Sequence, residues 1–299
     1  MWIIYALLTF ACWGIADLFY KIGNTGENNY NHLKTGIIVG FVMGIHAFIY
    51  VIINHLNINI IDIIKYLPVS LFYISSMVIG YRGLKYLELS ISSPIQNTSG
   101  VITALLLLIF FKEQYDYPFY IAVVLIFIGI ILLSLIELKD NKEKRIEYRK
   151  NNVKSKVIAL TIIFPLIYCI LDGAGTFLDG IYLDKLELIS EDSALVSYEF
   201  TFLIYGIITY IYLKLKKQEF KIINEKSKLF AALFETAGQF FYVFAMANSS
   251  TITAPIVGSY CVLSMLLSRL FLKEKLTKKQ YLAITLVLIG IFILAILDI

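Results

Sequence analysis

An internal repeat constrains this chain more than any other feature of its sequence. Residues 86–137 and 247–298 align without a gap when one copy is shifted by 161 positions. Among the matched positions that keep their residue type are Pro94 and Pro255, the Lys-Glu pairs 112–113 and 273–274, Tyr120 and Tyr281, and Gly129 and Gly290. Each copy contains two apolar runs near the length that spans a bilayer, about 20 residues. A duplicated unit built from such runs is typical of a transporter rather than of an enzyme.

The apolar runs continue along the whole chain and predict an all-α integral membrane protein. Hydrophobic residues make up 59% of the sequence and charged residues 16%, against roughly 25% charged residues in a soluble domain. The runs are continuous rather than alternating, which favours helices over a transmembrane barrel. We predict ten transmembrane helices, at residues 2–22, 34–53, 67–87, 91–111, 118–137, 157–180, 194–213, 229–247, 252–272 and 279–298.

A polar and basic interval at 139–156 divides these helices into two sets of five. We read it as a cytoplasmic linker between a first repeat, 1–138, and a second repeat, 157–299. Because five is an odd number, the second repeat enters the membrane in the opposite sense to the first. The predicted fold is therefore two inverted five-helix repeats, an architecture that places the substrate site near the bilayer midplane between them.

The basic residues predict the orientation of the chain. Of the 26 Lys and Arg residues, 21 fall in intervals on the side opposite the amino terminus and three on the amino-terminal side. Under the positive-inside rule this bias puts both termini outside the cytoplasm in a multi-pass plasma membrane protein. The net charge of +4 is thus a topological signal, aided by anionic membrane lipid, and indicates no nucleic-acid partner.

The carboxyl-terminal part of the chain resembles a known transporter module. Ala245–Leu297 contains an Ala-Pro pair at 254–255, Ser259, the sequence Phe-Leu-Lys-Glu-Lys-Leu-Thr at 271–277, Gln280 and an apolar run around Gly290. These features resemble the EamA module of the drug/metabolite transporter superfamily, and the first half resembles it through Ser93-Pro94, residues 111–113, Gly129 and an opening Trp13-Gly14. The resemblance implies transport of a small polar metabolite, amine, amino acid or drug. Small multidrug members carry a proton-coupling Glu in their first helix, where this chain has Trp13, with Asp17 one turn later.

Acidic residues inside the predicted helices carry the functional signal. Asp17, Asp172, Glu199 and Glu235 lie within apolar runs, where an acid that faces lipid costs about 2.5–3.5 kcal/mol or more. We therefore expect them to face a hydrated cavity, to find partners or to be protonated. Helical spacing groups them into faces with aromatic and polar neighbours. The faces are Trp13, Asp17 and Tyr20; Asp172, Thr176 and Asp179; and Glu235, Gln239 and Tyr242, with Tyr81 as the repeat counterpart of Tyr242.

From these faces we predict one substrate-binding site and no catalytic or metal site. Carboxylates beside aromatic rings suit a cationic or zwitterionic solute, since each ring adds about 0.5–2 kcal/mol of cation–π attraction. The predicted binding residues are Trp13, Asp17, Tyr81, Asp172, Glu235, Gln239 and Tyr242. One of the acids, with Glu235 ranked first, is the candidate for proton coupling.

Structural interpretations of the same residues stay open from the sequence alone. Asp17 can pair with Lys21, and Glu235 with Gln239 can form an interhelical hydrogen-bond clamp. We expect Glu199 in an outer vestibule and Asp179 at the membrane interface. The basic residues Arg82, Lys85 and Arg269 are expected to snorkel or pair. The small residues at the starts of 91–111 and 252–272 favour helix packing, although Gln96 and Asn97 can also form a polar cavity wall.

Taken together, the sequence predicts a monomeric secondary transporter without a cofactor, which works by alternating access and has proton coupling as an option. A facilitated uniporter or exchanger of a quaternary amine such as choline is the alternative within transport. An intramembrane enzyme is the alternative from another class, but the three histidines and three cysteines form no catalytic or metal-binding pattern. A channel or a scaffold is a further alternative. No ATP-binding loop is present in the sequence, so ATP is not expected to drive transport directly.

Overall fold

The computed structural model describes residues 2–25, 28–57, 59–86, 89–150 and 155–297, and within these ranges the protein is helical with no strand. The α-helices are α1 (Trp2–Asn24), α2 (Asn31–Ile53), α3 (Ile60–Gly83), α4 (Leu89–Phe111), α5 (Tyr117–Lys150), α6 (Ser155–Gly180), α7 (Glu191–Leu215), α8 (Lys226–Gly258), α9 (Cys261–Phe271) and α10 (Lys278–Leu297). A π-helical segment, η1 (Ile181–Lys185), extends α6, and a 3₁₀ turn, η2 (Ile222–Asn224), precedes α8.

Nine stretches in the described part of the chain are long and apolar enough to cross a membrane. This differs from the predicted ten, because Lys226–Phe271 forms one stretch of 46 residues. The helix predicted at 229–247 is continuous with the start of the one predicted at 252–272, and the two are separated only by a kink at Ser249, whose backbone is extended with φ −164° and ψ 80°. A second interruption, at Ser259 and Tyr260, separates α8 from α9. The first break falls between the two predicted helices, at the polar residues Asn248, Ser249 and Ser250, whereas the sequence did not predict the second break.

Two other helices differ from their predicted bounds. α3 begins at Ile60 rather than at residue 67, because the Asn59 side chain accepts a hydrogen bond from the Ile61 N–H at 3.0 Å and caps the helix. Its Pro68 lies inside the helix. α5 continues as helix to Lys150, so most of the predicted linker is an extension of that helix.

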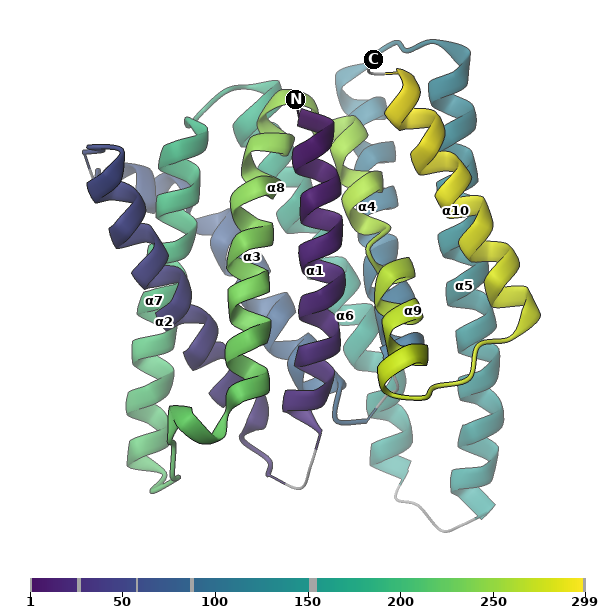
Figure 1. The fold of residues 1–299 in the computed structure, drawn as a ribbon, viewed down its shortest axis with the longest axis horizontal. Coiled ribbons are helices and arrows are strands. Elements are labelled where there is room, and N and C mark those ends of the chain that lie inside the picture. Colours follow the sequence, from purple (N-terminus) through teal and green to yellow (C-terminus); the bar gives the residue numbers. More distant parts are fainter. Residues whose placement is uncertain (1, 26–27, 58, 87–88, 151–154, 298–299) are drawn as a thin grey trace.

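The two halves pack through matching helices. α2 packs on α7, α5 on α10 and α4 on α9, whereas α1 packs on α8 and α3 on α6. This exchange of first and third helices is what a twofold relation between the halves produces. In Figure 1, α1 begins and α10 ends at one end of the bundle, and α5 ends and α6 begins at the other. We call these the terminal end and the linker end. α1 and α6 therefore run in opposite directions.

Glycines allow the closest approaches between the halves. A Cβ at Gly129 on α5 would lie 2.5 Å from Val287 Cγ2, and one at Gly290 on α10 would lie 2.6 Å from Ile126 Cγ1. Both glycines and both partners are matched by the 161-residue shift, so this contact is reciprocal. Gly40 on α2 is tighter still, since its Cβ would lie 2.3 Å from the carbonyl oxygen of Phe202 on α7. Small residues at such crossings let membrane helices pack backbone against backbone.

Candidate functional site

A cavity lies at the centre of the bundle, where helices of both halves meet. It is lined from α1, α3, α4, α6, α7 and α8 and from the turn that leads into α9. The lining residues are Trp13, Asp17, Tyr20, Tyr73, Met77, Gly80, Tyr81, Leu84, Gln96, Asn97, Ser99, Gly100, Tyr168, Asp172, Thr176, Tyr198, Glu235, Tyr242, Ala254, Val257, Gly258 and Tyr260. Sites in this position between two repeats are where secondary transporters hold their solutes.

Asp17 is held on the wall by hydroxyl groups from two other helices. Its Oδ2 accepts hydrogen bonds from Ser93 Oγ on α4 at 2.6 Å and from Ser264 Oγ on α9 at 2.8 Å. Lys21, one turn along α1, donates to the carbonyl oxygen of Leu84 at 2.7 Å. The small polar residues of α4 and α9 therefore orient an acid at the cavity, and this geometry supports the interpretation of Asp17 as a wall residue.

Asp172 begins a hydrogen-bonded network that crosses the cavity. Its Oδ2 accepts a hydrogen bond from Ser99 Oγ on α4 at 2.6 Å. One turn along α6, Thr176 Oγ1 accepts from the Tyr73 hydroxyl at 3.0 Å, and that hydroxyl lies 2.7 Å from the Tyr242 hydroxyl. The network joins α3, α4, α6 and α8, so it ties the position of this acid to helices of both halves.

Glu235 lies among aromatic residues. The Trp13 indole Nε1 donates to its backbone carbonyl oxygen at 3.4 Å, which holds α1 against α8. The rings of Tyr20 and Tyr81 lie close by in a tilted arrangement, with centroids 4.5 Å apart and an angle of 42° between their planes. Both tyrosine hydroxyls and Gln96 Nε2 are buried and have no hydrogen-bond partner among the described residues. Because an unpaired buried polar group costs about 1–3 kcal/mol, these three groups are suited to bind a ligand.

The charge on the cavity wall is of one sign. Asp17, Asp172 and Glu235 line it, and within the described ranges no Lys, Arg or His does. Trp13 and seven tyrosines provide the aromatic surface. Trp13 lies 5.0 Å from the Tyr242 ring and 5.8 Å from the Tyr260 ring, between centroids. Carboxylates in an apolar, aromatic surrounding need a proton or a bound cation to offset their charge.

Of the seven predicted binding residues, the structure brings six together on this wall and places one elsewhere. The six are Trp13, Asp17, Tyr81, Asp172, Glu235 and Tyr242. Gln239 is not among the residues that line the cavity; it is almost fully buried, and its Nε2 has no hydrogen-bond partner among the described residues. The interhelical clamp that Glu235 and Gln239 could form, an alternative left open by the sequence, has no side-chain hydrogen bond to another helix among the described residues.

Two acids lie where the sequence did not predict them. Asp179 was expected at the interface, but it is completely buried and accepts a hydrogen bond from the Tyr66 hydroxyl. Glu199 was expected in an outer vestibule, but its side chain is also fully buried and contacts His46. Distance along a helix predicts depth in the membrane but says nothing about which neighbours cover the side chain, so the burial of these two acids did not follow from the sequence.

The sequence did not predict several residues that line the cavity, notably Tyr73, Tyr168, Tyr198 and Tyr260. A signal existed for one of them: Tyr66, Tyr73 and Gly80 recur every seven residues along α3, which predicts a single face. The other three tyrosines lie in segments with abundant aromatic residues, where the spacing along the sequence did not distinguish aromatic residues that line the cavity from those that do not. Within the described residues, no group of three or more His, Cys, Asp or Glu side chains is placed to hold a metal ion.

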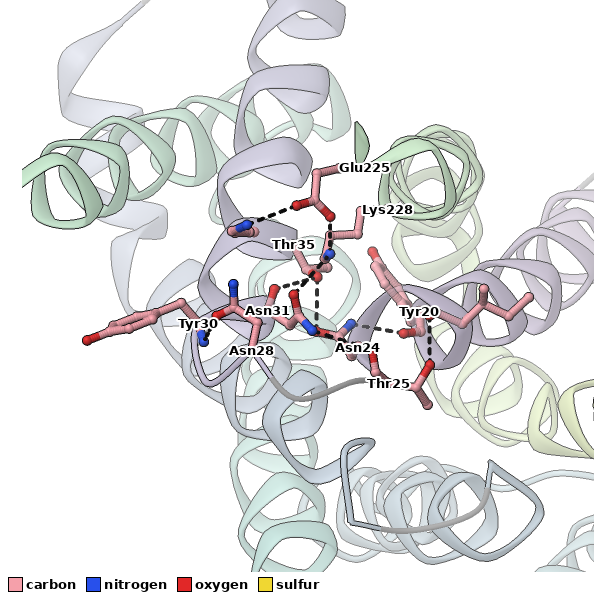
Figure 2. Close-up of polar contacts among 11 residues, drawn as sticks. Tyr20, Asn24, Thr25, Asn28, Tyr30, Asn31, Thr35, Glu225 and Lys228 are labelled. Carbon is pink, nitrogen blue, oxygen red and sulfur yellow. Dashed lines mark hydrogen bonds and ion pairs between the residues drawn. The ribbon is translucent and has the colours of Figure 1, made fainter. Parts of the chain in front are cut away.

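A second polar cluster joins the halves at the linker end, outside the cavity. Figure 2 shows the Glu225 carboxylate, just before α8, paired with Lys228. The other carboxylate oxygen of Glu225 lies 3.1 Å from Lys34 Nζ. Lys228 also donates to Asn31 Oδ1 at 3.4 Å. Burial raises the pKa of Glu225, but the hydrogen bonds and charges of Lys228 and Lys34 outweigh it and hold that pKa below its ordinary value.

Comparisons with known proteins agree with this geometry. Residues 1–135 and 158–296 each match the model of the EamA-like transporter family. A relative from Methanocaldococcus jannaschii, described as "Uncharacterized protein MJ1333.1", is 35% identical over 137 residues, which are 44% of this chain and 96% of that protein. That relative thus has about the length of one repeat. A solved crystal structure superposes with a TM-score of 0.66 and 10% identity, over 98% of this chain and 96% of the other, and it shows a shared fold alone.

Proposed function

Since this chain belongs to the EamA-like transporter family, we propose that it is a secondary active transporter that moves a small cationic or zwitterionic solute across the plasma membrane. The solute binds in the central cavity, and the two halves expose that cavity to each side in turn. Proton movement through one of the three wall acids drives accumulation.

The observation that carries this proposal is the excess of acidic over basic side chains on the described cavity wall. Asp17, Asp172 and Glu235 share one wall with no basic side chain within the described ranges. An anionic solute would add charge of the same sign inside a region of low dielectric, where like charges repel strongly. An amine or ammonium group instead offsets the charge and gains cation–π attraction from the rings.

The aromatic group formed by Trp13, Tyr242 and Tyr260 favours one narrower candidate, a quaternary amine such as choline. The tilted and edge-on rings offer faces to a cation that has no N–H groups to donate. The unpartnered Tyr20, Tyr81 and Gln96 groups favour instead a solute with polar atoms of its own. If the rings of Trp13, Tyr242 and Tyr260 provide most of the binding, the protein is a uniporter or exchanger of a quaternary amine and does not couple transport to protons.

A ligand screen on purified protein separates these candidates. Thermal unfolding is measured with amino acids, polyamines, quaternary amines, nucleosides and, as a counter-set, small carboxylic acids and sugar phosphates. A specific ligand at about 100 times its Kd should stabilise the protein by about 2.7 kcal/mol.

The stabilising ligand is expected to be an amine, and Asp172→Asn should weaken its effect. Glu187→Gln, which changes an exposed acid in the η1–α7 connection, is the matched control and should leave it intact. Stabilisation by the anions alone, with no amine effective, would overturn the proposed substrate class.

A further inference from the structure

Two Lys-Glu turns, one in each half, share an unusual backbone. Lys112 follows α4 with φ 52°, and Lys273 follows α9 with φ 58°. These positions are 161 residues apart. Left-handed backbone is uncommon for residues other than glycine, and it persists only where the surrounding structure demands it. In both halves it turns the following glutamate back towards the bundle.

Glu274, which follows Lys273, holds the start of α4 in the other half. Its Oε1 accepts a hydrogen bond from the Leu89 N–H at 3.1 Å, and its Oε2 accepts from the Ser90 N–H at 2.9 Å. The first N–H groups of a helix have no partner within it, and they favour a negative charge. One carboxylate of the second half thus caps a helix of the first half.

Glu113, which follows Lys112, makes the equivalent contact in the opposite direction. Its Oε2 accepts a hydrogen bond from Thr251 Oγ1 at 2.6 Å, and Thr251 is the repeat counterpart of Ser90. Lys185 of η1 pairs with the same carboxylate. Neighbouring Asp184 accepts from the Ser250 N–H at 2.8 Å, so this end of the second half's helix is capped too.

The two contacts lie at opposite ends of the cavity. Glu274 meets the first residues of α4 and Glu113 follows its last ones, which places them about 34 Å apart along a helix of 23 residues. The cavity residues Asn97, Ser99 and Gly100 lie between, near the middle of α4. At each end the glutamate is partly exposed while its partner is buried, with Thr251 0% and Ser90 3% exposed.

We propose that these contacts are the two latches of the transport cycle. The terminal latch is Glu113 with Thr251 and Lys185, and the linker latch is Glu274 with the N–H groups of Leu89 and Ser90. Each latch joins the two halves across one mouth of the cavity, and access to one side requires its latch to open while the other stays closed. This inference rests on the proposed alternating access, but its test needs neither a substrate nor flux.

The test measures access to a cysteine in the cavity from each side of the membrane. The three native free cysteines, Cys12, Cys169 and Cys261, are first replaced by alanine. Gln96→Cys then supplies a reporter on the wall, whose side-chain nitrogen had no partner among the described residues. A membrane-impermeant thiol reagent is applied to spheroplasts and to inverted vesicles, and the labelling rate is measured in both.

Two isosteric variants open the latches one at a time. Thr251→Val removes only the hydroxyl of the terminal latch, and Glu274→Gln leaves one acceptor for two N–H groups in the linker latch. Each should raise the labelling rate about tenfold, the effect of losing one charge-assisted hydrogen bond, and the two variants should act from opposite sides of the membrane. Glu187→Gln at the terminal end and Glu219→Gln at the linker end, both exposed, are controls that should change neither rate.

The outcome decides between a gating role and a structural one. Loosened packing without gating would raise labelling from both sides in each variant, and such a result overturns the latches. Unchanged rates in both variants overturn them as well. Should either variant fail to fold, Glu113→Gln and Glu274→Asp serve as replacements. Wild-type transport with unchanged labelling would leave the transporter proposal standing, whereas opposite shifts without any transported solute would leave the latches standing.

Discussion

His46 Nδ1 on α2 lies 2.8 and 2.9 Å from the two carboxylate oxygens of Glu199 on α7. The Glu199 side chain is 0% exposed and that of His46 is 33% exposed. The pair crosses between the two halves at the α2–α7 contact and lies outside the cavity wall. It therefore provides a further ionisable contact between the halves, besides Lys34–Glu225 and Lys185–Glu113 and separate from the three acids of the candidate site.

Removing the histidine should destabilise the protein more than neutralising the acid. His46→Leu leaves the buried carboxylate without its partner, and breaking a buried pair in this way costs about 3–5 kcal/mol. Glu199→Gln keeps a hydrogen bond to the ring and should cost less. Thermal unfolding in detergent measures both. His55→Asn is the control because His55 is exposed and asparagine tolerates its positive φ. Equal effects of the two changes would argue against the pair.

The orientation of the chain is predicted to place both ends outside the cytoplasm. The bias of basic residues motivates this, and α1 begins at the same end of the bundle at which α10 ends. Reporter fusions after Ile299 and within 139–156 should report opposite compartments, with the former outside. A carboxyl terminus in the cytoplasm would refute the prediction.

Glu235→Gln should abolish accumulation driven by a pH gradient in liposomes while leaving binding or exchange measurable. Glutamine cannot take up a proton, so the movement of one charge through the membrane potential, about 2.3 kcal/mol per 100 mV, is no longer coupled to the solute. Uptake with and without an imposed gradient measures this, with Glu187→Gln as control. If Glu235→Gln and Asp172→Asn both accumulate solute like the wild type, the acids do not carry the protons, and uniport or sodium coupling becomes the better explanation.

Glu225→Gln should destabilise the protein at pH 7 and lose its effect in acid. The folded pKa of Glu225 lies below its ordinary value of 4.5. Its stabilising contribution is therefore present above pH 4.5 and is lost as the pH falls through the lower, folded pKa. At pH 7 the variant leaves Lys34 and Lys228 without their carboxylate, at a cost of about 1–3 kcal/mol. Unfolding temperatures are compared between pH 7 and pH 4. A difference that persists unchanged or grows towards low pH would contradict this assignment.

Gly40→Ala should destabilise the α2–α7 contact by about 1–3 kcal/mol, because the new methyl group meets the Phe202 carbonyl oxygen at 2.3 Å and backbone must move. Gly173→Ala on α6 is the matched change. There the nearest atom, Ser99 Cβ, lies 3.5 Å away, so alanine should be neutral or stabilise the helix by up to about 1 kcal/mol. Thermal unfolding in one detergent compares the pair. Similar effects at both positions would show that these helices approach less closely.

The spacing of acidic and aromatic residues along single helices predicted much of the candidate site. The stripe of Trp13, Asp17 and Tyr20 on α1 and the position of Asp172 on α6 follow from helical spacing and from the cost of an acid in lipid. The 161-residue shift pairs Tyr81 with Tyr242 from the sequence alone, and both residues line the cavity. These inferences succeed because each depends on neighbours within one segment, or on a repeat that the residues themselves display.

Contacts between segments needed the tertiary structure. Serines of α4 and α9 donate hydrogen bonds to Asp17, and no spacing along α1 predicts these partners. Gln239 lies on the stripe of Glu235 but is not among the residues that line the cavity. The same limit applies to Glu199 and Asp179, whose burial depends on α2 and α3.

By itself, the sequence determined a helical membrane protein with a duplicated unit, because apolar length and periodicity are local properties. Only the fold decided which acids share a cavity, which are covered, and that each Lys-Glu turn reaches the opposite half, because these contacts depend on how the helices pack against one another.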